Sequence, residues 1–194
     1  HLNKLVNTYL DTLPSFINND TKRVHTTFNQ ARVSTGRLSS NKPNFQNIPI
    51  KTDTGKEIRK AFIPQNENHF IYSFDYSQIE LRILTHFTNE PELLKAFNNE
   101  EDIHLRTASL IFGVPEDEVD NSKRQIAKTI NYSILYGAGP FRISQELKIP
   151  IKDAAEIIKN YFNSYPQIKN YIDSTVVFGE KHGFVKTLNG RQRK

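Results

Sequence analysis

The residues of this chain best suited to chemistry lie at one junction, Ser73-Phe74-Asp75-Tyr76-Ser77-Gln78-Ile79-Glu80. The alternating side chains of residues 70–76 predict a β-strand, and the apolar positions from Ile79 to Phe87 recur at helical spacing. Hard divalent cations bind carboxylate oxygens that rigid elements hold in place. We therefore expect a strand-to-helix corner that presents Asp75 to a metal ion. A simple turn carboxylate is the alternative, because Asp commonly follows a strand.

Glu80 has two interpretations that spacing alone does not separate. Ser77-x-x-Glu80 is the pattern of a capping box, in which Ser77 is the N-cap and Glu80 returns a hydrogen bond to the helix start. The alternative is that Glu80, the second carboxylate of this junction, takes part in its chemistry.

Residues 122–137 predict a second helix with two different faces. Ile126, Ile130 and Ile134 recur every four residues on one side. The other side carries a stripe that begins basic and ends aromatic: Arg124, Lys128, Tyr132 and Tyr136. Two cations one turn apart, roughly 6 Å along the axis, are spaced to bind a polyphosphate, with an aromatic ring near the sugar and base. An ordinary helix with a solvated basic end is the alternative.

Two further features are ambiguous by themselves. Residues 34–49 form an aperiodic polar stretch, interpreted either as a surface loop or as a strip of donors for phosphate and minor-groove base edges. Asp102 is expected to cap a helix over 102–112, which places His104 in the first turn. There the imidazole either faces an anion or is exposed without a function.

Composition narrows the classes of protein. The chain has 194 residues, a net charge of +5 and a pI near 9.3, which permits nucleic-acid binding. It contains no Cys, so thiol catalysis and disulfides are excluded. No signal peptide or membrane-spanning run is visible in the sequence, and we expect no membrane association. His1 and the complete lack of Met predict a piece of a larger protein.

Taken together, these motifs resemble the polymerase domain of family A DNA polymerases, the DNA polymerase I group of bacteria and phages. The resemblance covers essentially the whole chain in the right order. Its residues are Thr35-Gly36-Arg37-Leu38-Ser39-Ser40, Asn44-Phe45-Gln46-Asn47-Ile48-Pro49, Asp75 to Arg82, and Arg124-x-x-x-Lys128-x-x-x-Tyr132-x-x-x-Tyr136-Gly137.

The resemblance implies a role for each matching residue. Asp75 and Lys128 are implied as catalytic, and Asp75 with the carbonyl of Tyr76 as ligands of a pair of Mg²⁺ ions. Glu80 would pack against Tyr132 and exclude a ribose 2′-hydroxyl. The implied dNTP-binding set is Gln78, Glu80, His104, Arg124, Lys128 and Tyr132. The implied DNA-binding set is Arg37, Asn44, Gln46, Asn47 and Tyr136.

The resemblance also implies an α+β fold, a partial right-hand polymerase with antiparallel palm strands followed by mainly helical fingers. We expect the end of a thumb helix or palm entry at 1–17, a palm portion at 18–87 and fingers at 88–194. The family's second catalytic aspartate would lie beyond Lys194. The chain alone is therefore expected not to extend a primer.

The expected activity is template-directed DNA synthesis, with primer-template DNA and dNTPs as partners, a monomeric intact protein and a cytoplasmic location. A non-catalytic nucleic-acid-binding module remains the alternative. A metal-dependent phosphohydrolase using Asp75 and His104 is disfavoured, because the sequence contains no clustered set of His and Asp ligands. Tyr132 stands where many bacterial members carry Phe, which implies weaker rejection of dideoxynucleotides.

Overall fold

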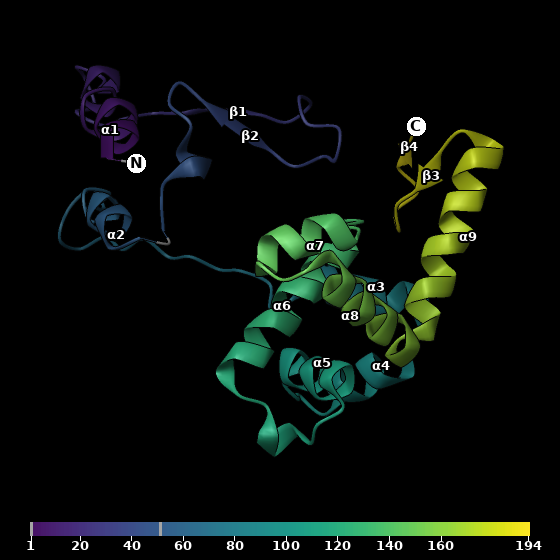
Figure 1. The fold of residues 1–194 in the computed structure, drawn as a ribbon. Coiled ribbons are helices and arrows are strands. Elements are labelled where there is room, and N and C mark those ends of the chain that lie inside the picture. Colours follow the sequence, from purple (N-terminus) through teal and green to yellow (C-terminus); the bar gives the residue numbers. More distant parts are fainter. Residues whose placement is uncertain (1, 51) are drawn as a thin grey trace. The chain divides into compact units, whose positions relative to one another are not determined.

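The computed structural model describes residues 2–50 and 52–194, and the chain divides into two compact units, residues 1–74 and 75–194. Figure 1 shows the elements of both. Each unit is described by itself. The predicted palm portion, 18–87, extends past this division, and the assignment of palm and fingers stays a prediction.

The first unit contains short elements. Its helical segments are α1 (Leu2–Leu5), a π-helical turn η1 (Val6–Leu10), the 3₁₀ turns η2 (Leu13–Phe16) and η3 (Phe45–Asn47), and α2 (Asp53–Arg59). Its strands β1 (Thr27–Asn29) and β2 (Ser39–Asn41) form an antiparallel pair in which Phe28 lies opposite Ser40. Leu5, Tyr9 and Ile58 form a small buried cluster.

Gly55 allows the close packing of α2. A Cβ atom at this position would lie 2.8 Å from Cβ of Pro49, so any larger residue would push α2 away from the preceding segment.

The second unit is a layered set of helices with a terminal hairpin. The helices are α3 (Ile79–Thr88), α4 (Pro91–Asn98), α5 (Ile103–Phe112), the 3₁₀ turn η4 (Glu116–Glu118), α6 (Asn121–Leu135), α7 (Pro140–Leu147), α8 (Ile151–Ser164) and α9 (Pro166–His182). Strands β3 (Val185–Lys186) and β4 (Gln192–Arg193) pair after α9, drawn in yellow in Figure 1. Within the described residues, no helix is long and apolar enough to cross a membrane.

One apolar core joins these helices. α5 packs against α6 and α8, α7 against α8, and α3 against α9. The core consists of Leu81, Leu84, Leu93, Ala96, Ile103, Ile111, Ile130, Ile134, Ile143, Ala154, Tyr161, Tyr165 and Ile168. The helices predicted at 79–87, 102–112 and 122–137 are present as α3, α5 and α6, with ends shifted by one or two residues. The α+β class is confirmed, with helices dominating after residue 78.

The predicted strand at 70–76 is wrong, because none of these residues is in a strand. The alternation itself persists: the rings of Phe70 and Tyr72, and those of Tyr72 and Phe74, have centroids 6.3 Å apart, as alternate side chains on one side of an extended backbone should. A strand also needs a hydrogen-bonded neighbour, and no segment among residues 2–50 and 52–194 pairs with this one.

Glu90 connects the start of α4 to the start of α9. Its side chain is buried, and its carboxylate accepts a 2.9 Å hydrogen bond from the backbone N–H of Gln167, in the first turn of α9. Burial raises the pKa of Glu90 above its ordinary 4.5, although the backbone N–H of Gln167 acts in the opposite direction. The folded protein therefore binds the proton of the Glu90 carboxyl group more tightly than the unfolded chain does.

We expect the free energy of unfolding to depend on pH through Glu90. Since its folded-state pKa is raised, the stabilisation is fully present below pH 4.5 and is lost as the pH rises through the folded-state pKa. Glu90→Gln keeps an oxygen acceptor for Gln167 and removes the charge, so it should be at least as stable as the wild type at neutral pH. Glu90→Ala should cost about 1 kcal/mol, because it leaves the Gln167 N–H unpaired.

Urea unfolding of the three proteins at acidic and neutral pH measures these differences. A wild-type protein whose stability relative to Glu90→Gln does not change with pH would contradict the raised pKa.

Candidate functional site

The predicted site residues fall into both units. Arg37, Asn44, Gln46 and Asn47 belong to the first unit, whereas Asp75, Tyr76, Gln78, Glu80, His104, Arg124, Lys128, Tyr132 and Tyr136 belong to the second. The second set is brought together at the starts of α3, α5 and α6 and along one side of α6.

The corner before α3 differs from its predicted form. Gln78, not Ser77, is the N-cap residue; its φ of 51° is left-handed, and its side chain makes no capping bond. The Ser77–Glu80 capping box is therefore absent. Arg82 holds the corner instead, because its Nε donates to the carbonyl of Ser77 at 3.1 Å. Asp75 and Tyr76 are exposed.

Glu80 contacts the far end of α6. The hydroxyl of Tyr136 donates a 2.6 Å hydrogen bond to Oε1 of Glu80. Tyr132, one turn earlier, is half-buried, and burial raises its pKa, with the negative charges of Glu80 and Asp75 adding to the shift. Glu80, Asp75 and both tyrosines are thus neighbours.

Helix α6 has the two faces that its sequence predicts. Ile130 and Ile134 are buried and Ile126 packs against the core. Arg124 is about one-third exposed and Lys128 is exposed. Tyr136 ends the helix as its C-cap, and Gly137 follows with a φ of 72°, a left-handed conformation that glycine adopts without strain.

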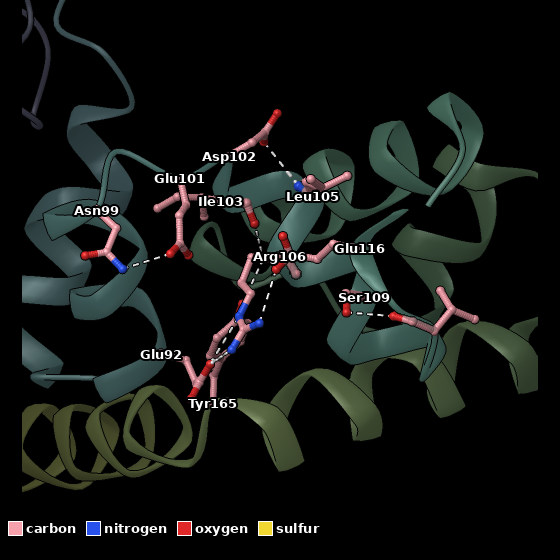
Figure 2. Close-up of polar contacts among 12 residues, drawn as sticks. Glu92, Asn99, Glu101, Asp102, Ile103, Leu105, Arg106, Ser109, Glu116 and Tyr165 are labelled. Atoms are coloured by element: carbon pink, nitrogen blue, oxygen red, sulfur yellow. Dashed lines mark hydrogen bonds and ion pairs between the residues drawn. The ribbon is translucent and has the colours of Figure 1, made fainter. Parts of the chain in front are cut away.

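Asp102 joins the first turn of α5 to Arg124. Its Oδ1 accepts the backbone N–H groups of His104 and Leu105 at 2.9 and 3.1 Å, which confirms the predicted N-cap; Figure 2 draws the second of these bonds. Its Oδ2 accepts a 2.7 Å bond from Nε of Arg124. Partial burial acts to raise the pKa of Asp102, but the bonds from Arg124 and the two backbone groups outweigh it and lower this pKa.

Arg106 anchors the same helix from its other side. Its guanidinium bonds Glu92 at 2.6 Å and Glu116 at 3.1 Å, as Figure 2 shows, and so ties α5 to α4 and η4. These ion pairs raise the pKa of Arg106, with the hydrogen bond that it donates to Glu92 as the largest cause. The start of α5 is therefore held in place by charged contacts on two sides.

His104 is buried, which overturns the interpretation of an exposed histidine without a function. Its Nδ1 lies 3.1 Å from the side-chain nitrogen of Asn131, and its ring lies 5.9 Å from that of Tyr132. Burial lowers the pKa of His104; Asp102 acts to raise it, and the nearby charges of Lys128 and Arg124 lower it further.

Asn131 and Thr107 are functional candidates that the sequence reasoning missed. Both are buried beside His104. The signal was present, since Ala127, Asn131 and Ile134 have the i, i+4, i+7 spacing of a buried helical stripe. A polar residue on such a stripe must find a partner inside the protein.

In the first unit, two predicted DNA-binding side chains shape their own loop. Asn44 caps the turn η3 by accepting the backbone N–H of Gln46 at 2.9 Å. Gln46 donates to the carbonyl of Leu38 at 2.9 Å and accepts the N–H of Ser40 at 3.2 Å. The carbonyl of Asn47 accepts from Tyr9, and Arg37 is exposed. Their contact with DNA stays a prediction.

No group of three or more His, Asp or Glu side chains suited to a metal ion occurs within residues 2–50 and 52–194. Arg124, Lys128 and His104 lie near one another, an arrangement that suits anion binding.

Comparison with known proteins gives a consistent result. The sequence profile described as "DNA polymerase family A" matches residues 1–194. The chain is 48% identical over 192 residues to "DNA polymerase I, thermostable" of Thermus aquaticus, covering 99% of this chain and 23% of that protein. It is 49% identical over 192 residues to DNA polymerase I of Deinococcus radiodurans, covering 99% of this chain and 20% of that protein. The chain thus spans about a fifth of the length of these relatives.

A solved structure is also similar. The POL domain of Pol1 from M. smegmatis, in complex with DNA primer-template and dNTP, superposes with a TM-score of 0.84 at 39% identity. The match covers 95% of this chain and 32% of that chain.

Two substitutions separate the functions of Asp102. Asp102→Ala should lower the free energy of unfolding by about 1 to 2 kcal/mol, because α5 loses its N-cap. Asp102→Asn keeps the capping oxygen and loses only the charged bond to Arg124, so it should cost less than about 1 kcal/mol.

Chemical unfolding of the chain at neutral pH measures both costs. Since the pKa of Asp102 is lowered, the difference between wild type and Asp102→Asn should shrink as the pH falls below 3.8 and through the folded-state pKa. Equal costs for the two variants at neutral pH would show that the cap contributes nothing.

Proposed function

The chain belongs to DNA polymerase family A, and we propose that it forms the part of a template-directed DNA polymerase that binds the incoming dNTP and supplies one carboxylate to the catalytic metal site. The reaction is transfer of a nucleotidyl group from dNTP to the 3′-hydroxyl of a primer. This activity is proposed for the intact gene product, because the chain spans about a fifth of its relatives.

The observation that carries the proposal is the gathering of Arg124, Lys128 and His104 at one end of α5 and α6. Both cations lie close enough to lower the pKa of His104, and Arg124 is held by Asp102 beside it. A triphosphate carries several negative charges on oxygens spaced along a chain, which suits cations one helical turn apart. Lys128 neutralises charge that develops on the phosphates during transfer.

Glu80 and Tyr132 are proposed to contact the sugar of the incoming nucleotide, and Tyr136 to contact the templating position. Glu80 and Tyr132 are neighbours, which supports the exclusion of a ribose 2′-hydroxyl by Glu80. In the present conformation Glu80 accepts from Tyr136. Tyr136 is proposed to cover the templating position, and Gln78 to lie near the nucleotide.

The metal site is incomplete among the described residues. Asp75 is an exposed carboxylate beside the carbonyl of Tyr76, and no cluster of three ligands surrounds it. A two-metal mechanism needs carboxylates that bridge two ions. We propose that Asp75 and the Tyr76 carbonyl contribute to a Mg²⁺ pair in the intact product, and we assign no step of the reaction to these residues alone.

The first unit is proposed to contact primer-template DNA through Arg37 and the polar loop that Asn44, Gln46 and Asn47 build. The polymerase-domain relative of known structure binds primer-template and dNTP, and the net charge of +5 suits a nucleic-acid partner. A monomeric state and a cytoplasmic location stay predictions.

Primer extension by the intact gene product tests the function. Asp75→Asn should reduce incorporation of dNTPs at least about a hundredfold, because a metal ligand supplies several kcal/mol of transition-state stabilisation. Lys128→Ala should reduce it about ten- to a hundredfold through loss of a charge-assisted bond to phosphate. The 194-residue chain alone should extend no primer.

Asp153→Asn and Lys159→Ala serve as matched controls, since both residues are exposed on α8. If Asp75→Asn incorporated dNTPs as the wild type does, the polymerase assignment of this site would be wrong. Nucleotide-independent DNA binding with a steep salt dependence and no synthesis would favour the non-catalytic binding module.

Tyr132 provides a test of sugar selection. We expect Tyr132→Phe to lower the ratio of dideoxynucleotide to deoxynucleotide incorporation by about tenfold, because the tyrosine hydroxyl replaces a contact that a missing 3′-hydroxyl cannot make. Competition assays with paired ddNTP and dNTP measure this ratio. An unchanged ratio would remove Tyr132 from sugar discrimination.

A further inference from the structure

A chain of four buried polar side chains crosses from α6 through α5 to the start of α9. It consists of His104, Asn131, Thr107 and Tyr165, none more than 3% exposed. Asn131 Nδ2 lies 3.1 Å from Nδ1 of His104 and 3.1 Å from Oγ1 of Thr107. The hydroxyl of Tyr165 lies 2.9 Å from the same Thr107 oxygen. Neighbouring core positions are apolar, so these four groups depend on one another for hydrogen bonds.

The direction of each hydrogen bond follows from Thr107. Its hydroxyl has one proton, and its oxygen lies 2.7 Å from the backbone carbonyl of Ile103, which only accepts. That bond therefore takes the Thr107 proton. Burial raises the pKa of Tyr165 to about 12, so its hydroxyl keeps its proton. It donates that proton to Thr107, because the Thr107 proton is already directed to Ile103. Thr107 then accepts from Nδ2 of Asn131 at 3.1 Å, a shorter contact than the 3.4 Å between the Thr107 oxygen and Oδ1 of Asn131.

The orientation of the Asn131 amide then determines which ring nitrogen of His104 carries the proton. Since Thr107 accepts from Asn131, the amide places its NH₂ group toward Thr107, and the same nitrogen faces Nδ1 of His104. One amide N–H donates to Thr107 and the other to Nδ1. A ring nitrogen that accepts carries no proton, so the proton of the neutral imidazole is on Nε2.

The surroundings of His104 favour the neutral ring. Burial, Lys128 and Arg124 all disfavour a positive charge there, and only Asp102 opposes them, while Asp102 also pairs with Arg124. Among the described residues no hydrogen bond to Nε2 of His104 is found, whereas Nδ1 lies against Asn131. Nδ1 of His104 therefore accepts from Asn131, and the N–H at Nε2 remains to donate to another group.

We infer that Asn131 is a positioning residue that fixes neutral His104 with its proton on Nε2, so that His104 offers an uncharged N–H donor to the nucleotide triphosphate. The inference rests on the proposed dNTP-binding role of His104. It adds which ring nitrogen carries the donated proton and which residue keeps it there. Two cations already balance phosphate charge at this site. An uncharged donor binds a phosphate oxygen without placing a third positive charge beside Arg124 and Lys128.

The experiment combines ¹⁵N NMR of histidine-labelled intact gene product with steady-state kinetics of dNTP incorporation. His104→Ala identifies the resonances of His104. The wild-type ring should show an unprotonated Nδ1 and a protonated Nε2. Asn131→Ala should mix the two tautomers and raise the KM for dNTP about fivefold, equivalent to about 1 kcal/mol, with a smaller change in kcat.

Two variants separate positioning from packing. Asn131→Asp presents only acceptors, so Nδ1 should become protonated and the KM for dNTP should gain a dependence on pH across about pH 5 to 8, through the titration of His104 beside Asp102, Arg124 and Lys128. Tyr165→Phe disturbs the same buried chain but leaves the Asn131–His104 bond intact. It should lower stability and leave the KM within about twofold of wild type.

A protonated Nδ1 in the wild type would overturn the inference while leaving the proposed function standing. Equal rises in KM for Asn131→Ala and Tyr165→Phe would also overturn it, because the buried chain would then act only through packing. An unchanged KM in His104→Ala would instead overturn the dNTP-binding role of His104 itself, whatever tautomer the NMR shows.

Discussion

The packing of α6 against α5 determines how the basic residues of the candidate site are presented. Ala127, Ile130 and Ile134 are buried in the core that α5 shares. Turning α6 to bring Arg124 or Lys128 inward would expose these residues and bury a charge, and burying an unpaired charge costs several kcal/mol or more. The apolar face thus determines which way the cations point, although it never contacts a ligand.

Asp102 adds a second constraint at the surface. It caps α5 with one oxygen and pairs with Arg124 through the other. A partly exposed ion pair of this kind contributes about 1 kcal/mol or less. In the proposed function, a triphosphate would bring more negative charge than one carboxylate and would displace Asp102 from Arg124 at small cost. Until then the pair holds the guanidinium in place and reduces the repulsion between Arg124 and Lys128.

The features predicted correctly from the sequence depend on residues close together in the chain. The helices of the second unit depend on periodicity, on caps such as Asp102 and on breakers such as Gly137, all of which lie within a few residues of their effect. What it predicted poorly depends on distant partners. The alternation at 70–76 was read correctly, but a strand needs a neighbour that no described segment supplies. The left-handed backbone at Gln78 moved the N-cap away from Ser77.

His104 at the candidate site also depends on residues that are distant in the sequence. Its place in the first turn of α5 followed from Asp102, but its burial depends on Asn131, 27 residues away, and on a chain that reaches Tyr165, another 58 residues from Thr107. No local pattern around His104 contains these residues. The stripe of Ala127, Asn131 and Ile134 shows that Asn131 is buried, but only the packing of the helices shows which group it meets.

The residues proposed to bind the triphosphate and the residues proposed to bind metal ions therefore differ in how firmly the described structure supports them. The residues proposed to bind the triphosphate lie on helices whose opposite faces are buried, and charged contacts and a buried polar chain hold them further. Asp75 follows an extended segment in which Phe74 is 92% exposed, and Tyr76 after it is 79% exposed. Catalytic geometry needs a rigid support, and an unpaired extended segment provides little. Pairing of residues 70–76 with another strand would give Asp75 a rigid support, so the residues proposed to bind the nucleotide are organised independently of the proposed metal site.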